Sequence, residues 1–292
     1  MILVIVGPTG VGKTKLSIFL AEKYNAEIIS SDSVSIYKNV NIGSAKPSIE
    51  ETKGIKHHFI DRCSLNEEYS VYNYQTEARK VLNELIDKKK NVVIVGGTGL
   101  YIKALLYDYR FTKKTKEDED FSNFSNLEIK NKILSLDPNN QIHVNNRKRM
   151  IRFLNSYEEK DTNNNNINTP LYDFITIGLT TSRDKLYEII NTRVDNMIDK
   201  GLLEEASNLF NKGYKKLDYI IGYKELNKYF RKEITYKESI EEIKKNTRKY
   251  SKRQYTWFNN QMKDIKWFDT NFIDFNKTIK EIEDYLVSFN IK

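Results

Sequence analysis

The sequence predicts an α/β fold, in which a parallel sheet is flanked by helices, with a small helical insertion and a helical C-terminal region. Three observations predict it. Residues 2–6 and 92–95 have the length and the continuous apolar character of buried parallel strands. Each is followed by a glycine-rich turn. After each turn, apolar residues recur at helical spacing, which is the start of a β–α–β unit.

The other elements follow from the same periodicities. A further strand is expected at residues 27–30, just before Asp32. Apolar residues on one face predict a helix over residues 71–85. Thr181 and Asp184 match the capping box that begins many helices, and the chain looks mainly helical from there onward. Two more helices are expected, at residues 129–136 and 237–258.

The chain is predicted to form one catalytic core and one insertion. The core comprises residues 1–109 and 136–292, and the insertion comprises residues 110–135. Residues 113–124 are charged and poor in apolar side chains, which is typical of a linker or a mobile insertion. Residues 158–170 contain a run of asparagines and are expected to form a loop.

Composition limits the partner and the compartment. The 292 residues carry a formal net charge of +8, which favours a polyanionic partner such as nucleic acid, phosphate or an anionic lipid surface. No apolar run is long enough to cross a membrane, and the first one is too short for a signal peptide. Cys63 is the single cysteine, which excludes a disulfide framework and favours a reducing, cytoplasmic location.

The strongest motif is Gly-x-x-x-x-Gly-Lys-Thr, between the first strand and the first helix. Its glycines let main-chain N–H groups converge on phosphate oxygens. Its lysine neutralises an outer phosphate, and its threonine hydroxyl can hold Mg²⁺. The motif predicts a P-loop NTPase-like fold and polyphosphate binding, without specifying ATP. The predicted phosphate-binding residues are Gly7, Pro8, Thr9, Gly10, Val11, Gly12, Lys13 and Thr14, and Thr14 is the predicted metal ligand.

Two charged residues elsewhere stand out. Asp32 follows a strand end, where α/β sheets present their working residues, although a helix cap or a ligand to Mg²⁺-bound water fits equally. Arg193 lies near the buried side of its helix, which is costly unless an anion compensates it; an internal salt bridge is the simpler explanation. His57 and His58 lack metal-ligand spacing and are predicted to be a structural pair.

Two basic clusters favour an RNA partner. A solvated face is the ordinary explanation for such a cluster. Two of them, in a chain with a phosphate loop and many aromatic residues, favour RNA, because unpaired bases stack on aromatic rings. On the second cluster's helix, Ile243, Tyr250 and Trp257 lie on the other face. The first cluster contains Arg147, Lys148, Arg149 and Arg152, and the second contains Lys245, Arg248, Lys249, Lys252 and Arg253.

These residues together resemble the tRNA dimethylallyltransferases, also called tRNA isopentenyltransferases, over about residues 2–258. The phosphate loop occurs in many ATPases and kinases, whereas three later segments, in this order, are specific to the family. They are Asp32-Ser33 running to Ile42-Gly43-Ser44-Ala45-Lys46-Pro47, Gly96-Gly97-Thr98-Gly99-Leu100-Tyr101, and Lys252-Arg253-Gln254 with Thr256-Trp257-Phe258. The chain departs from the family pattern at Asn146, Asn155 and Ile189.

The resemblance implies transfer of a dimethylallyl group from dimethylallyl diphosphate to the N6 amine of the adenosine immediately 3′ of the anticodon in tRNA. It implies that the loop holds the diphosphate with Mg²⁺, that Asp32 is the general base, and that Thr9 and Arg193 assist catalysis. It implies an insertion that contacts tRNA, and we expect a cytoplasmic monomer. The implied tRNA-binding residues are Asp32, Ser33, Val34, Ser35, Thr98, Lys148, Arg149, Met150, Ile151, Arg152, Gly222, Tyr223, Lys224, Arg248, Lys252 and Arg253.

Three other functions compete with this interpretation. A P-loop nucleoside or metabolite kinase would use the phosphate loop and Asp32, but it leaves residues 96–101 and both basic clusters without a role. A non-enzymatic RNA-binding ATPase would use the basic clusters, but it gives Asp32 and Arg193 no role. An adenylate isopentenyltransferase shares the loop but acts on a free nucleotide, which needs no long cationic helix.

Overall fold

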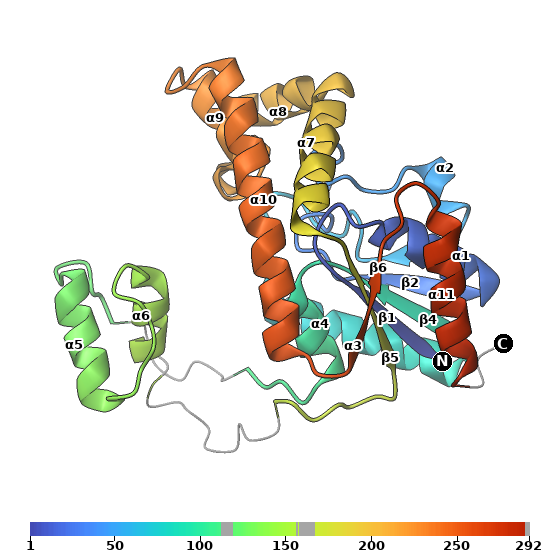
Figure 1. The fold of residues 1–292 in the computed structure, drawn as a ribbon. Coiled ribbons are helices and arrows are strands. Elements are labelled where there is room, and N and C mark those ends of the chain that lie inside the picture. Colours follow the sequence, from blue (N-terminus) through green and yellow to red (C-terminus); the bar gives the residue numbers. More distant parts are fainter. Residues whose placement is uncertain (112–118, 156, 158–166, 290–292) are drawn as a thin grey trace. The chain divides into compact units, whose positions relative to one another are not determined.

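The computed structural model describes residues 1–111, 119–155, 157 and 167–289 (Figure 1). Within them, one parallel sheet has the strand order β3-β2-β4-β1-β5-β6. β1 lies between β4 and β5 and is buried along its whole length, as a continuous apolar strand should be. The strands are β1 (Ile2–Val6), β2 (Ala26–Ser30), β3 (His57–His58), β4 (Asn91–Val95), β5 (Ile175–Thr180) and β6 (Ile265–Asp269).

Helices cover both faces of the sheet (Figure 1). On one face, α1 (Lys13–Lys23) and α11 (Phe275–Val287) pack over Leu3 and Ile5 of β1 in one buried cluster. Val4, between them, is equally buried but points to the opposite face, because side chains alternate along a strand. There, α3 (Val71–Asp87) packs against α4 (Gly99–Leu106) and β4.

A group of helices follows β5 and lies beyond the carboxyl edge of the sheet (Figure 1). The longest, α10, has 26 residues and packs against α7, α9 and α4, so it connects this group to the sheet. The members are α7 (Arg183–Asp199), α8 (Leu202–Asn211), the 3₁₀ helix η2 (Lys215–Tyr219), α9 (Tyr223–Phe230) and α10 (Tyr236–Gln261), and the short α2 (Ile49–Thr52) lies earlier in the chain.

Residues Tyr107–Thr169 form a second compact unit, separate from the unit made by Met1–Leu106 and Pro170–Lys292. Its described helices, α5 (Asn126–Leu136) and α6 (Arg147–Asn155), share one apolar core. The sequence predicted an insertion at 110–135, and this boundary is wrong, because α6 buries Met150 against α5 and therefore belongs to the same unit. Phe121 is also in this core, although its segment was expected to be a linker or a mobile insertion.

Several expected elements are confirmed, and others need correction. The helices expected at 71–85, 129–136 and 237–258 are α3, α5 and α10, each slightly longer. Ser182, not Thr181, caps α7, by accepting a hydrogen bond from the Lys185 N–H. The C-terminal region was expected to be mainly helical, yet it contains β6, an edge strand whose half-exposed residues give only a weak apolar signal.

Most of the asparagine-rich loop expected at 158–170 lies outside the described residues, since the description resumes at residue 167. Of the helices in the described ranges, none combines the length and apolar character needed to span a bilayer.

Candidate active site

The phosphate loop joins β1 to α1 and leaves the amino end of that helix open. Gly12 is the N-cap residue and has a φ of 91°, a left-handed conformation that glycine adopts without strain. No side chain caps α1, so its first N–H groups are available to an anion. The Lys13 Nζ donates a hydrogen bond to the Pro8 carbonyl oxygen at 2.7 Å and so lies over the loop.

Lys13, Arg193 and Asp32 form one charge cluster. Burial and the charge of Arg193 lower the pKa of Lys13 to about 7, although Asp32 opposes the shift. Burial also lowers the pKa of Arg193, again against the effect of Asp32. Two cations therefore share one carboxylate, and an anionic ligand would relieve their repulsion. The internal salt bridge expected for Arg193 is not formed with any described residue.

Two cavities share a wall at this cluster. The first, of about 700 Å³, is lined by the phosphate loop and includes Lys13 and Thr14. The second, of about 280 Å³, is lined by residues of α7 and α10 and by the segment before α9. Thr9, Asp32 and Arg193 line both cavities. The three predicted catalytic residues thus stand between a phosphate side and a helical side.

Asp32 is held in a tight turn directly after β2. Its Oδ1 accepts hydrogen bonds from the N–H groups of Val34 at 2.8 Å and Ser35 at 3.1 Å. Thr98 fixes the same turn, because its Oγ1 accepts from the Ser33 N–H at 3.1 Å and donates to the Ser33 Oγ at 3.2 Å. With one carboxylate oxygen fixed by the backbone, the other can accept a proton. Asp32 can therefore cap the turn with one carboxylate oxygen and act as a general base with the other.

The loop that follows is fixed from the helical group by Glu205 of α8. This carboxylate accepts hydrogen bonds from the N–H groups of Asn41, Ile42 and Gly43, at 3.0 to 3.2 Å. The Tyr223 hydroxyl donates to the same carboxylate. Three consecutive N–H groups on one carboxylate set the path of the loop toward the cavities.

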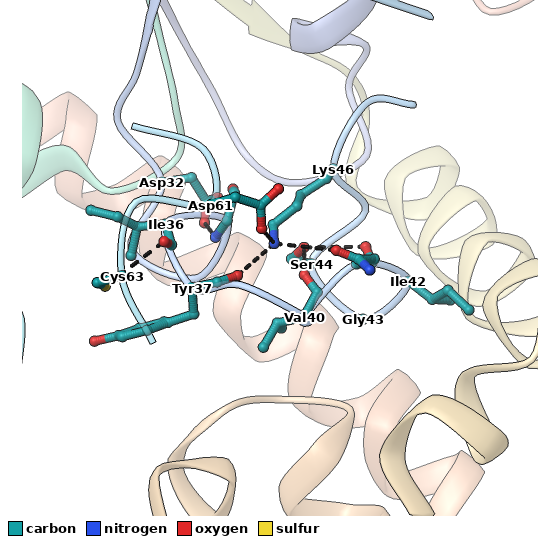
Figure 2. A network of polar contacts seen from close by, with 12 residues as sticks. Asp32, Ile36, Tyr37, Val40, Ile42, Gly43, Ser44, Lys46, Asp61 and Cys63 are labelled. Atoms are coloured by element: carbon teal, nitrogen blue, oxygen red, sulfur yellow. Dashed lines mark hydrogen bonds and ion pairs between the residues drawn. The ribbon is translucent and has the colours of Figure 1, made fainter. Parts of the chain in front are cut away.

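Lys46 fixes the other end of this loop (Figure 2). Its Nζ donates to the Tyr37 carbonyl oxygen at 2.5 Å and forms an ion pair with Asp61 at 2.6 Å. Its side chain is only 5% exposed, and Asp61 balances its charge, so Lys46 holds the loop in place. Between the two anchors lies Ser44, which borders both cavities.

The glycines after β4 serve close packing. A side chain on Gly97 would collide with the Gln254 amide, and one on Gly99 would collide with the Trp257 ring. Gly96 similarly has no room against the Ser31 backbone. Gly97 and Gly99 therefore let α10 pack directly against the end of the sheet.

Comparisons with known proteins identify the family of this chain. The family model described as IPP transferase matches residues 35–261. A tRNA dimethylallyltransferase of Anoxybacillus flavithermus is 42% identical over 98% of this chain and 96% of its own length. A Bacillus pumilus enzyme of the same name is 43% identical, over 92% and 89% of the two chains. This chain belongs to the IPP transferase family. It is a transferase, and the P-loop-like α/β fold class predicted from the sequence is confirmed.

Solved structures give the same result for this IPP transferase family member. A tRNA isopentenylpyrophosphate transferase from Bacillus halodurans matches with a TM-score of 0.78 and 36% identity, over 98% of this chain and 95% of that one. A eukaryotic dimethylallyltransferase acting on tRNA matches with a TM-score of 0.82 and 28% identity, over 98% and 79% of the two chains.

In the larger unit, most residues expected to bind tRNA gather around the second cavity. Its lining includes Ser33, Val34, Gly222, Lys224 and Arg253. Thr98 contacts one of these residues, because its Oγ1 donates a hydrogen bond to the Ser33 Oγ. Lys252 is exposed on α10.

Three residues of this set have internal partners or little exposure. The Tyr223 side chain is buried and bonded to Glu205, so its role is structural. Arg248 donates to the Asn191 Oδ1 at 2.6 Å and lies over the Tyr187 ring. Ser35 is 7% exposed, and its backbone N–H holds Asp32.

In the smaller unit, α6 separates the expected tRNA contacts into two faces. Lys148, Arg149 and Arg152 are exposed, as a nucleic-acid surface requires. Met150 is fully buried in the core, so the expected contact with tRNA is wrong for its side chain, and Ile151 packs against the same core. Arg147 of the basic cluster is structural, because it donates hydrogen bonds to the carbonyl oxygens of Phe121 and Phe124.

The sequence interpretation missed two residues at the site. Tyr250 lines the second cavity, and burial together with the charge of Asp32 raises its pKa to about 12. Gln254 is buried beside it. Both lie on the buried side of α10, whereas the predicted tRNA contacts of this helix were its basic residues. His57 and His58 both have hydrogen-bond partners, as a structural pair should, since His57 bonds to the Ile55 carbonyl and His58 to Glu27, although His57 also lines the first cavity.

Proposed function

We propose that this protein transfers the dimethylallyl group of dimethylallyl diphosphate to the N6 amine of the adenosine immediately 3′ of the anticodon, giving N6-isopentenyladenosine and diphosphate. One observation carries the proposal: Thr9, Asp32 and Arg193 form the shared wall between a phosphate-side cavity and a second cavity. A transfer enzyme needs its donor and its acceptor on opposite sides of such a wall. The names of the relatives supply the substrate class.

The phosphate side stabilises the leaving group. As the bond between the dimethylallyl carbon and the diphosphate oxygen breaks, negative charge accumulates on the diphosphate. The open N–H groups of α1, the Lys13 ammonium and the Arg193 guanidinium are fixed where that charge develops. Thr9 lies at the boundary, where its hydroxyl reaches the oxygen that leaves.

The helical side receives the base. An adenosine within the anticodon loop must leave its stack to enter the second cavity, as other base-modifying enzymes require. The lone pair of its amine is delocalised into the purine, so the amine is a weak nucleophile. Asp32 accepts a proton from the amine as the new carbon–nitrogen bond forms.

The residues of the phosphate side fit a magnesium ion that binds together with the diphosphate. Thr14 offers an exposed hydroxyl there, and the described ranges contain no group of three acidic, histidine or cysteine side chains that could hold a metal alone. Mg²⁺ commonly takes few protein ligands and completes its shell with water and substrate phosphates. The ion, held by Thr14 and the diphosphate, would add positive charge beside the leaving group.

The tRNA itself needs contacts beyond the cavity. We assign these to the exposed cations of α6 in the smaller unit and to Lys252 and Arg253 of α10. A cytoplasmic monomer remains our expectation, and sedimentation of the free protein tests the oligomeric state.

The direct test is nucleoside mass analysis of unmodified tRNA after incubation with the protein, dimethylallyl diphosphate and Mg²⁺. We expect isopentenyladenosine next to the anticodon, formed without ATP. A strict ATP requirement, or phosphate transfer from labelled ATP, would favour the kinase alternative. Prenylation of free AMP in preference to tRNA would favour the adenylate isopentenyltransferase.

A further inference from the structure

Gln254 of α10 connects the two glycine-rich segments at the carboxyl edge of the sheet. Its Oε1 accepts a hydrogen bond from the Thr9 N–H at 2.9 Å, and its Nε2 donates to the Gly97 carbonyl oxygen at 3.0 Å. The side chain is only 6% exposed. The two partners lie 245 and 157 residues away in the chain. In the described ranges, no other side chain forms hydrogen bonds with both segments, so this single amide fixes the distance between them.

The contact with Thr9 determines what this loop residue can do. Because the Thr9 N–H points to Gln254, it is not one of the amides available to phosphate oxygens. The threonine backbone is therefore anchored from outside the loop. Its side chain is then presented at the boundary of the two cavities, which Thr9 helps to line.

Gln254 is also connected to Asp32 through neighbouring side chains. The Tyr250 hydroxyl, one helical turn before Gln254, lies close to the side chains of Gln254 and Thr98. Thr98 in turn holds the Ser33 backbone, directly after Asp32. The leaving-group side and the base side of the site are thus connected through one face of α10.

We infer that Gln254 is a positioning residue for prenyl transfer, which acts through Thr9 by fixing the Thr9 hydroxyl at the boundary between donor and acceptor. The inference rests on the proposed function and adds a residue to it. An amide suits this position, because Thr9 presents a donor and Gly97 an acceptor. A carboxylate would face the Gly97 carbonyl with a second oxygen, and an apolar side chain would leave both backbone groups unpaired.

The test is a double-mutant cycle on the single-turnover rate at saturating tRNA and dimethylallyl diphosphate. Gln254→Met keeps the shape and removes both hydrogen bonds, and Thr9→Val removes the hydroxyl that Gln254 is inferred to position. We expect Gln254→Met to slow single turnover by about 10²-fold, the scale of a small misplacement of a reacting group. In the Thr9→Val background the same change should cost only a few-fold, since the positioned hydroxyl is already absent.

Binding measurements separate positioning from loss of structure. The tRNA dissociation constant of Gln254→Met, measured well below its thermal midpoint, should stay close to that of Asn259→Leu, a comparable amide-to-apolar change on the exposed face of the same helix. The thermal midpoint of Gln254→Met should be the lower of the two, because two backbone groups lose their partners. Multiplicative losses in the cycle, or a loss confined to tRNA binding, would overturn the inference. The wild-type product tests the proposed function independently: if it contains no isopentenyladenosine, that function fails, whatever the variants do.

Discussion

Two glycine-rich segments follow neighbouring strands of the same sheet, and they do different work. The segment after β1 opens the amino end of α1 and places Lys13 beside it. The segment after β4 has no space for side chains at its glycines, because the backbone after β2 and the side chains of α10 fill it, while the backbone of Gly96 and Gly97 borders the first cavity. Glycine provides access for a ligand in the first case and access for a helix in the second.

The difference lies in what surrounds each segment. After β1, a lysine and an uncapped helix create an excess of positive charge that needs an anion. After β4, Gln254 and Trp257 occupy the space that side chains at positions 97 and 99 would need. Asp32, between them in the chain, is held by its own turn and by Thr98 of the second segment. The packing segment therefore positions the residues that act on the ligand of the binding segment.

The largest effect should come from Asp32, which lies between these two segments. Asp32→Asn keeps the shape and the acceptor for the Val34 N–H but cannot accept the adenosine proton. We expect a loss of about 10²- to 10⁴-fold in single-turnover rate, the usual cost of losing a general base. Affinity for tRNA, measured by filter binding, should change far less. A near-normal rate, or a loss confined to binding, would make Asp32 a positioning residue only.

A substitution after β4 tests whether that segment is purely structural. Gly99→Ala places a methyl group against the Trp257 ring and should destabilise the protein by about 1–3 kcal/mol, the cost of overpacking a filled site. Thermal unfolding should show the loss, and the companion change Trp257→Leu should recover part of it. Affinity for inorganic diphosphate should remain unchanged in the folded variant. Lower affinity with normal stability would mean that this segment also binds the ligand.

Sequence alone identified both segments, but it gave a physical role only to the binding one. The phosphate loop is recognisable because its eight residues are contiguous and directly follow a strand. Gln254 stood out only as part of a segment that resembles the family, and its contacts gave no such signal, because its partners Thr9 and Gly97 come from distant parts of the chain. Residue patterns marked Arg193 only as a costly burial, the family resemblance implied its catalytic role, and its proximity to Asp32 required the fold.

The boundary of the smaller unit was missed for a similar reason. The residues of α6 suggest a basic helix, and nothing in their spacing shows that Met150 packs against Ile129 and Ile133 of α5. Contacts between elements, in contrast to the elements themselves, are weakly encoded in local patterns.

The binding segment should also respond to pH. With its pKa lowered to about 7, Lys13 is largely neutral at pH 8 in the free protein. Bound diphosphate favours the ammonium and raises this pKa, so binding above pH 7 takes up a proton. The dissociation constant for inorganic diphosphate should therefore rise by up to about tenfold per pH unit above 7, and be insensitive to Lys13 below it. Lys13→Arg, which stays charged, should lose this dependence when titrated by calorimetry.

The smallest effect should come from the exposed side of α10, opposite the face that packs on Gly97 and Gly99. Lys249 and Lys252 are exposed there, whereas Arg248 on the same stripe is held by Asn191 and Arg253 lines the second cavity. Replacing the first two with alanine should release about two fewer counterions on tRNA binding and flatten the salt dependence accordingly.

The salt series also separates the two faces of this helix. Single-turnover chemistry at saturating tRNA should survive the double alanine change, because neither residue touches Thr9 or Gly97. Arg248→Ala serves as the comparison. Its guanidinium already has a partner, so its loss should lower stability more than the salt slope. An unchanged salt slope in the double variant would mean that this stripe is only a solvated face, and that α10 contributes to the enzyme through its buried side alone.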